Sequence, residues 1–131
     1  MAVVFAAALC FAACATSALN IPEDLTPAEL IQRAQEASDK NRYNLALQYY
    51  TVLLERNRTN IDLVCTAEYE IAFIHYKQKN YSQAKDGFNS LLERYEGPEG
   101  DLLPPQFKRL ATLVLERISE REKPILERNK G

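Results

Sequence analysis

The residues that could perform acid–base or nucleophilic chemistry are few in this 131-residue chain. His75 is the single histidine, and no known motif places a serine or an aspartate beside it. Glu68 and Glu70 are two residues apart, so a helix would direct them to different faces and they would not form a carboxylate pair. The sequence also contains no glycine-rich phosphate loop and no histidine–cysteine cluster at metal-ligand spacing. We therefore expect a protein without enzymatic activity, cofactor or metal.

Cysteine offers a different chemistry, acylation, at Cys14. The apolar run from Ala2 to Cys14 is shorter than the roughly 20 apolar residues that span a bilayer, and it fits the core of a secretory signal peptide. The sequence Phe11-Ala12-Ala13-Cys14 resembles a bacterial lipobox, in which small residues precede the cysteine that becomes the lipidated N-terminus. Phe11 replaces the usual leucine, as in relaxed spirochaete lipoboxes. We expect residues 1–19 to be a signal peptide and Cys14 the lipidation site.

Two other interpretations of the N-terminus stay open. Thr16-Ser17-Ala18 is also a small-residue cleavage site, and a cut after Ala18 would leave an unmodified chain beginning at Leu19. The leader carries no Lys or Arg, which a signal peptide normally has, and a buried helix of a soluble protein is the third interpretation. In either signal-peptide interpretation Cys65 is the one cysteine of the mature domain, and we expect it to be a small buried residue.

Three aromatic residues could bind a ligand rather than react with one. Tyr69, Phe73 and Tyr76 recur at positions i, i+4 and i+7, which places them on one stripe of a helix. Aromatic side chains with polar tips are frequent anchors of protein interfaces. The alternative is that the last helix covers the stripe, which would then be core.

The elements that position these residues are helices. Glycine is scarce, with 4 residues, and no alternating run outside the leader is long enough for a strand. Thr26-Pro27-Ala28-Glu29 has the pattern of a capping box with proline at the first helical position. Residues 20–26 are expected to form a tether, and residues 124–131 a polar tail that starts where Pro124 ends or kinks the last helix. The patterns predict helices over residues 27–39, 43–56, 61–78, 81–95 and 106–122.

An internal repeat relates the middle helices. The pattern Tyr-x-x-Ala-x-x-x-aromatic begins at Tyr43 and again at Tyr81, 38 residues later, and both copies continue into Leu-Leu-Glu-Arg. The two Leu-Leu-Glu-Arg sequences are interpreted as solvated helix ends. The repeat resembles that of the tetratricopeptide family, in which a large–small pair such as Ile71-Ala72 lies on the first helix. It departs from that family by four extra residues between the units and by Arg58 and Glu96 in place of a terminal proline.

The resemblance implies an all-α fold, a short right-handed solenoid of two helix pairs over residues 27–123, with the last helix as a cap. In such proteins the first helix of each unit lines a binding groove. This would place Ile31 and Ser38 in the groove, with the principal candidates Tyr69, Phe73, Tyr76, Lys77, Gln35 and Asp39.

The implied function is protein binding. The second unit is most similar to repeats of small bacterial envelope lipoproteins, so we expect a lipid-anchored, periplasm-facing adaptor in an outer-membrane assembly, transport or cell-wall complex. A net charge of −2 and the lack of a basic cluster argue against nucleic acid as a partner. The alternative is a binding protein for a small apolar ligand, in a pocket between the third and fifth helices.

Overall fold

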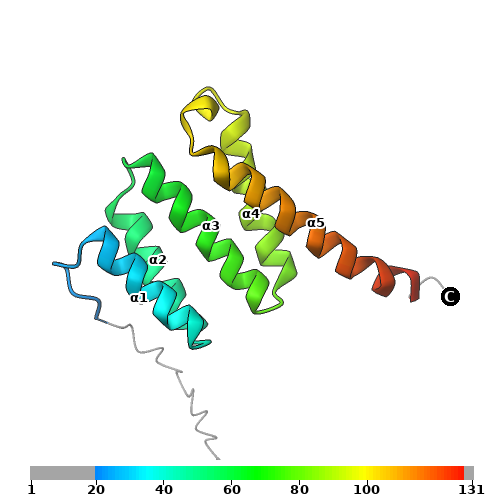
Figure 1. Ribbon diagram of the computed structural model, residues 1–131, viewed down its shortest axis with the longest axis horizontal. Helices are drawn as coiled ribbons and strands as arrows, with labels where there is room; N and C mark the ends of the chain where they lie inside the picture. The colour runs from blue at the N-terminus through cyan, green and yellow to red at the C-terminus, as the bar shows by residue number, and fades with distance from the viewer. Residues whose placement is uncertain (1–19, 129–131) are drawn as a thin grey trace, which may run out of the picture.

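The computed structural model describes residues 20–128, with the side chains of residues 20–124. No strand occurs in that range, so the predicted all-α class is confirmed. The helices lie in a row in chain order, each packed against the next (Figure 1). They are α1 (Pro27–Asp39), α2 (Tyr43–Arg56), α3 (Ile61–Lys77), α4 (Tyr81–Glu96) and α5 (Pro105–Arg128), with a short 3-10 helix, η1 (Gly100–Leu102), before the last.

Helix α1 begins at the predicted capping box. The backbone N–H of Glu29 donates to the Thr26 hydroxyl at 3.3 Å, and the Thr26 N–H donates to the Glu29 carboxylate at 2.9 Å. The hydrogen bonds from Thr26 lower the pKa of Glu29. These contacts satisfy backbone donors that the first turn of a helix leaves free, and they fix where the first helix pair starts.

Two helix pairs, α1–α2 and α3–α4, make up most of the structure. Within each pair, the two helices are connected by a turn of the same geometry. Asn41 and Lys79, which are 38 residues apart, both have left-handed backbone conformations, with φ of 57° and 63°. After each, a backbone N–H reaches back across the turn, from Arg42 to the Ala37 carbonyl at 2.8 Å and from Asn80 to the His75 carbonyl at 2.9 Å. The sequence repeat therefore corresponds to a repeat of backbone geometry.

The buried positions repeat with the same spacing. Small residues lie where the helices of a pair approach each other, and larger residues fill the remaining space. Helices α3 and α4 come so close that a Cβ atom on Gly87 would lie 2.8 Å from the Ala72 Cβ. Four pairs of positions, each at most 1% exposed, are equivalent: Ala34 and Ala72, Ala46 and Ala84, Tyr50 and Phe88, and Leu53 and Leu91.

The segment predicted as a tether is docked on the first helix pair. Ile21 is buried in the core of α1 and α2. The Arg56 guanidinium, in the last turn of α2, donates to the carbonyl oxygens of Pro22 at 3.0 Å and of Ile21 at 3.3 Å. The tether prediction followed from Pro22, which prevents a helix but does not prevent burial of the residue before it.

The predicted end of the last helix is wrong. Helix α5 continues through Pro124 to Arg128. Proline removes one backbone hydrogen bond and crowds the preceding turn, but few helical residues follow it here, so few bonds depend on it. Helix α5 packs on α4, and its Ala111, Val114 and Ile118 side chains are buried in the same core cluster as Phe88 and Leu91.

Candidate functional site

The predicted aromatic stripe divides into a buried part and a surface part. Tyr69 is 7% exposed, and its ring centroid lies 5.8 Å from that of Phe73, 5.6 Å from Phe88 on α4 and 5.4 Å from Phe107 on α5. For Tyr69 the alternative interpretation therefore holds, since the last helix covers it. Burial raises the pKa of its hydroxyl. Tyr69 supports the α3–α5 contact and is not a surface anchor.

Phe73 and Tyr76 are half-buried and each lies beside a cation. Their rings stack at 5.7 Å. The Lys77 Nζ lies 5.4 Å from the centre of the Phe73 ring, and the Arg121 guanidinium of α5 lies 5.7 Å from the centre of the Tyr76 ring. Both distances fit cation–π attraction. We call these four residues the aromatic face.

The predicted residues of α1 lie next to the aromatic face. Lys77 donates from Nζ to the Ser38 hydroxyl at 2.9 Å, which ties α3 to α1. Gln35 and Asp39 are exposed, and Gln35 shares a side of α1 with Ser38, three residues on, and with Asp39, four residues on. The structure thus joins Ser38 of α1 to Lys77 of the aromatic face, and it places Tyr69 in the core.

Two polar groups with unused hydrogen-bonding capacity lie close to Lys77. Within residues 20–124, neither the Glu70 carboxylate nor the Tyr50 hydroxyl has a hydrogen-bond or ion-pair partner. Burial raises the pKa of Glu70, and the nearby Lys77 charge lowers it in part. Burial also raises the pKa of Tyr50, and the charges of Glu70 and Asp39 add to that increase. The partly exposed Glu70 carboxylate is therefore an available acceptor beside the aromatic face, whereas Tyr50 is buried in the core.

Glu70 and Tyr50 were not recognised as candidates from the sequence. Glu70 was considered only as half of a carboxylate pair. Its spacing to Phe73 and Lys77, three and seven residues, was the available signal, because these separations place all three residues on one side of a helix. Tyr50 reaches this region only through the packing of α2 against α3, which the sequence does not display.

His75 lies in a hollow of about 370 Å³ that is lined by residues of α3 and α4 and by Leu54 of α2. Its Nδ1 atom is buried and has no hydrogen-bond partner in the described part of the chain. Glu68 and Asp86 line the same hollow, but neither forms an ion pair with His75 there, and Glu68 is held by Arg94 at 2.6 and 2.8 Å. No acid–base pair is formed around His75 by these residues.

Cys65 is fully buried, as predicted. Burial raises the pKa of its thiol, which disfavours the reactive thiolate. The predicted lipidation site Cys14 and the signal peptide lie outside the described residues. Among the described helices, none is long and apolar enough to cross a membrane.

Comparison with known proteins gives one informative similarity. No family model matches the chain, and no solved structure matches it. An uncharacterized protein of Treponema pallidum (strain Nichols) is 36% identical over 99 residues, which cover 76% of this chain and 40% of that protein. The chain thus spans two fifths of the length of this relative.

Proposed function

We propose that this protein is a lipid-anchored adaptor on the periplasmic side of a bacterial envelope, which binds a segment of another protein. The observation that carries the proposal is the aromatic face: two half-exposed stacked rings, each with a cation beside it, next to the unpaired and partly exposed Glu70 carboxylate. Rings supply apolar contact area, the Glu70 carboxylate supplies an acceptor, and the exposed Lys77 ammonium supplies donors for a polypeptide backbone.

The repeated helix pair supports a tetratricopeptide-like solenoid. The turn, the small contact residues and the buried aromatic recur 38 residues apart, and each helix packs on the next in chain order. In a solenoid of this kind the first helices of successive units share one side. The Lys77–Ser38 hydrogen bond between α3 and α1 agrees with that arrangement.

A protein segment is favoured over a small apolar ligand between α3 and α5. That space is occupied by the Tyr69 ring and its neighbours Phe88 and Phe107, at centroid distances typical of packed aromatic pairs. A small ligand would have to displace these core rings. A polypeptide could instead lie across the surface rings, Phe73 and Tyr76.

The adaptor proposal is tested by site-specific photocrosslinking in native membranes. A photoreactive residue at position 35 or 39, both exposed on α1, should give a discrete crosslinked protein. The same residue at the exposed positions 89 or 93 of α4, which take no part in the aromatic face, should not. Equal crosslinking at both sets of positions, or none at either, would contradict the proposal.

A pair of charge reversals sharpens this test. Lys77→Glu removes the cation beside Phe73 and the bond to Ser38, and should abolish the crosslinks from positions 35 and 39. Lys79→Glu makes the same charge change two residues away, at an exposed turn position, and should leave them intact. Mass spectrometry of the mature N-terminus tests the anchor separately, since an unmodified chain beginning at Leu19 would refute lipidation of Cys14.

A further inference from the structure

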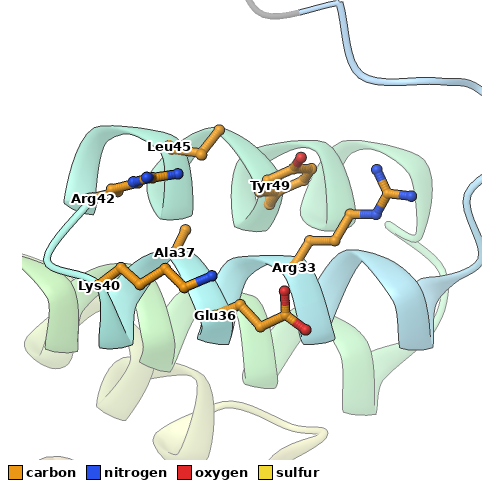
Figure 2. Close-up of a pocket in the computed structure, with 7 residues that line it drawn as sticks. All are labelled: Arg33, Glu36, Ala37, Lys40, Arg42, Leu45 and Tyr49. Carbon is orange, nitrogen blue, oxygen red and sulfur yellow. The ribbon is translucent and has the colours of Figure 1, made fainter.

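A second surface feature lies on the first helix pair, away from the aromatic face residues. A hollow of about 260 Å³ opens between α1 and α2, over the small side chain of Ala37. Its other lining residues are long and mostly charged. Figure 2 shows Leu45 and Tyr49 of α2 facing Arg33, Glu36 and Ala37 of α1, with Lys40 and Arg42 of the connecting turn together at one end.

The hollow carries an excess of positive charge. Arg33, Lys40 and Arg42 are exposed, and none has a carboxylate within ion-pair distance among the residues whose side chains are placed. Glu36 is the one carboxylate in the lining, and it accepts a hydrogen bond from Gln32 at 3.0 Å. Arg33 also lowers the pKa of Glu29 by its charge. Three cations and one acid leave the lining positive, although the whole chain has a net charge of −2.

The equivalent positions of the α3–α4 pair show that the fold does not require positively charged residues at the sites of Arg33, Lys40 and Arg42. Residues 38 positions after Arg33, Lys40 and Arg42 are Ile71, Gln78 and Asn80, which carry no charge. Four lining positions of the α1–α2 hollow correspond to four of the hollow that contains His75: Arg33 to Ile71, Ala37 to His75, Leu45 to Gln83, and Tyr49 to Gly87. The same backbone geometry thus supports a lining whose charged groups include Glu68 and Asp86 but no Lys or Arg in one pair, and a basic lining in the other.

Cations of this type recognise phosphate. A guanidinium presents a planar fork of donors that matches two phosphate oxygens, and a lysine adds a point charge. The Tyr49 hydroxyl has no hydrogen-bond partner within residues 20–124 and can add a donor. The hollow is open to solvent on a side where all three cations are exposed, so a headgroup at a surface can reach it.

The proposed anchor would bring this helix pair to a membrane. Ile21 is fixed on α1 and α2 by Arg56, and seven residue steps separate it from Cys14. An extended chain spans at most about 3.6 Å per residue, so a bilayer holding the Cys14 lipid would lie within about 25 Å of Ile21. Helix α1 is itself only about 20 Å long. Every part of the α1–α2 pair is therefore within reach of the surface.

We propose that the α1–α2 hollow binds the phosphate of anionic lipid headgroups, through Arg33, Lys40 and Arg42. The inference rests on the proposed lipid anchor, which supplies the proximity. Binding would orient the domain on the membrane by a second contact, and would hold the first helix pair against the bilayer. Each cation near an anionic lipid surface strengthens association by about fivefold.

The test is lysine acetylation of the full-length lipidated protein, followed by mass spectrometry. The protein is reconstituted in phosphatidylcholine vesicles, in the same vesicles with added phosphatidylglycerol, and in phosphatidylcholine vesicles with inorganic phosphate. We expect phosphatidylglycerol to slow acetylation of Lys40 by about fivefold or more, while Lys79, exposed on the other pair's turn, changes little. Equal slowing at both lysines, or at neither, overturns the proposal.

The third arm separates the two sources of phosphate. If inorganic phosphate alone protects Lys40 as well as phosphatidylglycerol does, the ligand is a free phosphate and the lipid assignment is wrong. Sedimentation of the same samples measures whether the lipid anchor holds the protein on the vesicles. A protein that stays out of the phosphatidylcholine pellet contradicts lipid anchoring itself. A protein that sediments without protection of Lys40 contradicts only the headgroup site.

Two double variants complete the design. Arg33→Gln with Arg42→Gln leaves Lys40 as the reporter and should remove most of its protection. Arg109→Gln with Arg117→Gln makes the same charge change at exposed positions of α5 and should preserve it. Loss of protection in both variants would show a non-specific charge effect and overturn the assignment. Should the first variant lose helical circular dichroism, the wild-type lipid arms still decide the question.

Discussion

The α1–α2 and α3–α4 pairs place equivalent residues 38 positions apart, but they differ in what covers them. The α3–α4 pair packs against α2 on one side and α5 on the other. The α1–α2 pair packs against α3 on one side, and residues 20–26 contribute the buried Ile21 to its core. In the α3–α4 pair, which is covered on both sides, three equivalent positions carry Phe88, Gly87 and Ile71. In the α1–α2 pair, at the end of the row, the same positions carry Tyr50, Tyr49 and Arg33, in that order.

Two equivalent arginines show how the neighbours decide a contact. Arg56 and Arg94 both end a Leu-Leu-Glu-Arg sequence, which was interpreted as a solvated helix end. Both arginines are exposed, as that interpretation expects, but each also makes a specific contact. Arg94 forms a two-bond ion pair with Glu68 on α3, whereas Arg56 binds backbone carbonyl oxygens of residues 21 and 22. The same residue in the same helical position therefore joins two helices in one pair and fixes an irregular segment in the other.

The largest difference in stability between the pairs is expected when the buried aromatic residue, Phe88 or the equivalent Tyr50, is replaced by alanine. Phe88→Ala should lower the free energy of unfolding by about 3–5 kcal/mol, because it leaves a cavity between α3, α4 and α5. Tyr50→Ala should have a smaller effect, because the less covered end pair can relax into the space. Urea unfolding followed by circular dichroism measures both. An equal or larger effect for Tyr50→Ala would show that covering by a second neighbour does not stiffen the α3–α4 pair.

Gly87 should tolerate no larger side chain. Gly87→Val places a Cβ atom 2.8 Å from the Ala72 Cβ and pushes α4 away from α3, so we expect a loss of about 1–3 kcal/mol in urea unfolding. The matched control is Asn89→Val, at an exposed position of the same helix, which reports helix propensity alone. Similar losses for the two variants would argue against close contact of the helices at Gly87.

Adding a hydroxyl group at Phe88 should destabilise the protein more than removing the hydroxyl group of the equivalent Tyr50. Phe88→Tyr would bury a hydroxyl beside Tyr69 without a partner, at a cost of about 1–3 kcal/mol. Tyr50→Phe removes a hydroxyl that has no partner within residues 20–124, and should change stability by less than about 1 kcal/mol. Thermal unfolding of the two variants provides the comparison. A strong loss in Tyr50→Phe would reveal that its hydroxyl is used.

Tyr50 should also make stability depend on alkaline pH. Its pKa is raised in the folded protein, whereas in the unfolded chain it ionises near its ordinary value of about 10. Above that pH the unfolded state releases a proton that the folded state keeps, so the free energy of unfolding falls as pH rises. We expect the urea midpoint to fall as pH rises above about 10, and to fall less in Tyr50→Phe. Identical slopes would contradict a raised pKa at Tyr50.

The smallest effects are expected at the two arginines, and they should differ in kind. Arg94→Gln removes a largely exposed ion pair, so we expect a loss under about 1 kcal/mol that shrinks in high salt. Arg56→Gln should have an equally small effect on global stability. It should, however, release residues 20–23 from the first helix pair, which would be seen as faster hydrogen exchange in that segment. Faster exchange in this segment for Arg94→Gln as well would remove the distinction between the pairs.

Much of the architecture could be predicted because it depends on local sequence. The capping box at Thr26 and Glu29 predicted the start of α1, and the spacing of Tyr43 and Tyr81 predicted the first residues of α2 and α4. The burial of Cys65 was also confirmed. The end of α5 was missed, because the cost of Pro124 depends on how many helical bonds follow it, and composition does not give that number.

The candidate residues were only partly predictable. Helical spacing placed Tyr69, Phe73 and Tyr76 on one stripe, but it could not say which of them another helix would cover. Tyr69 became core because Phe107 of α5 packs on it, and Phe73 and Tyr76 stayed at the surface beside Lys77 and Arg121. Contacts between residues far apart in the chain made this division.

The sequence by itself determined the helices, their order and the 38-residue repeat, because capping, turn chemistry and apolar spacing act within one or two helical turns. Only the tertiary structure decided how equivalent residues are used. The α1–α2 hollow, the Arg56 contacts and the unpaired Glu70 all arise from which helix lies next to which. A repeat presents the same positions twice, and its neighbours determine whether each position is covered, charged or free to bind.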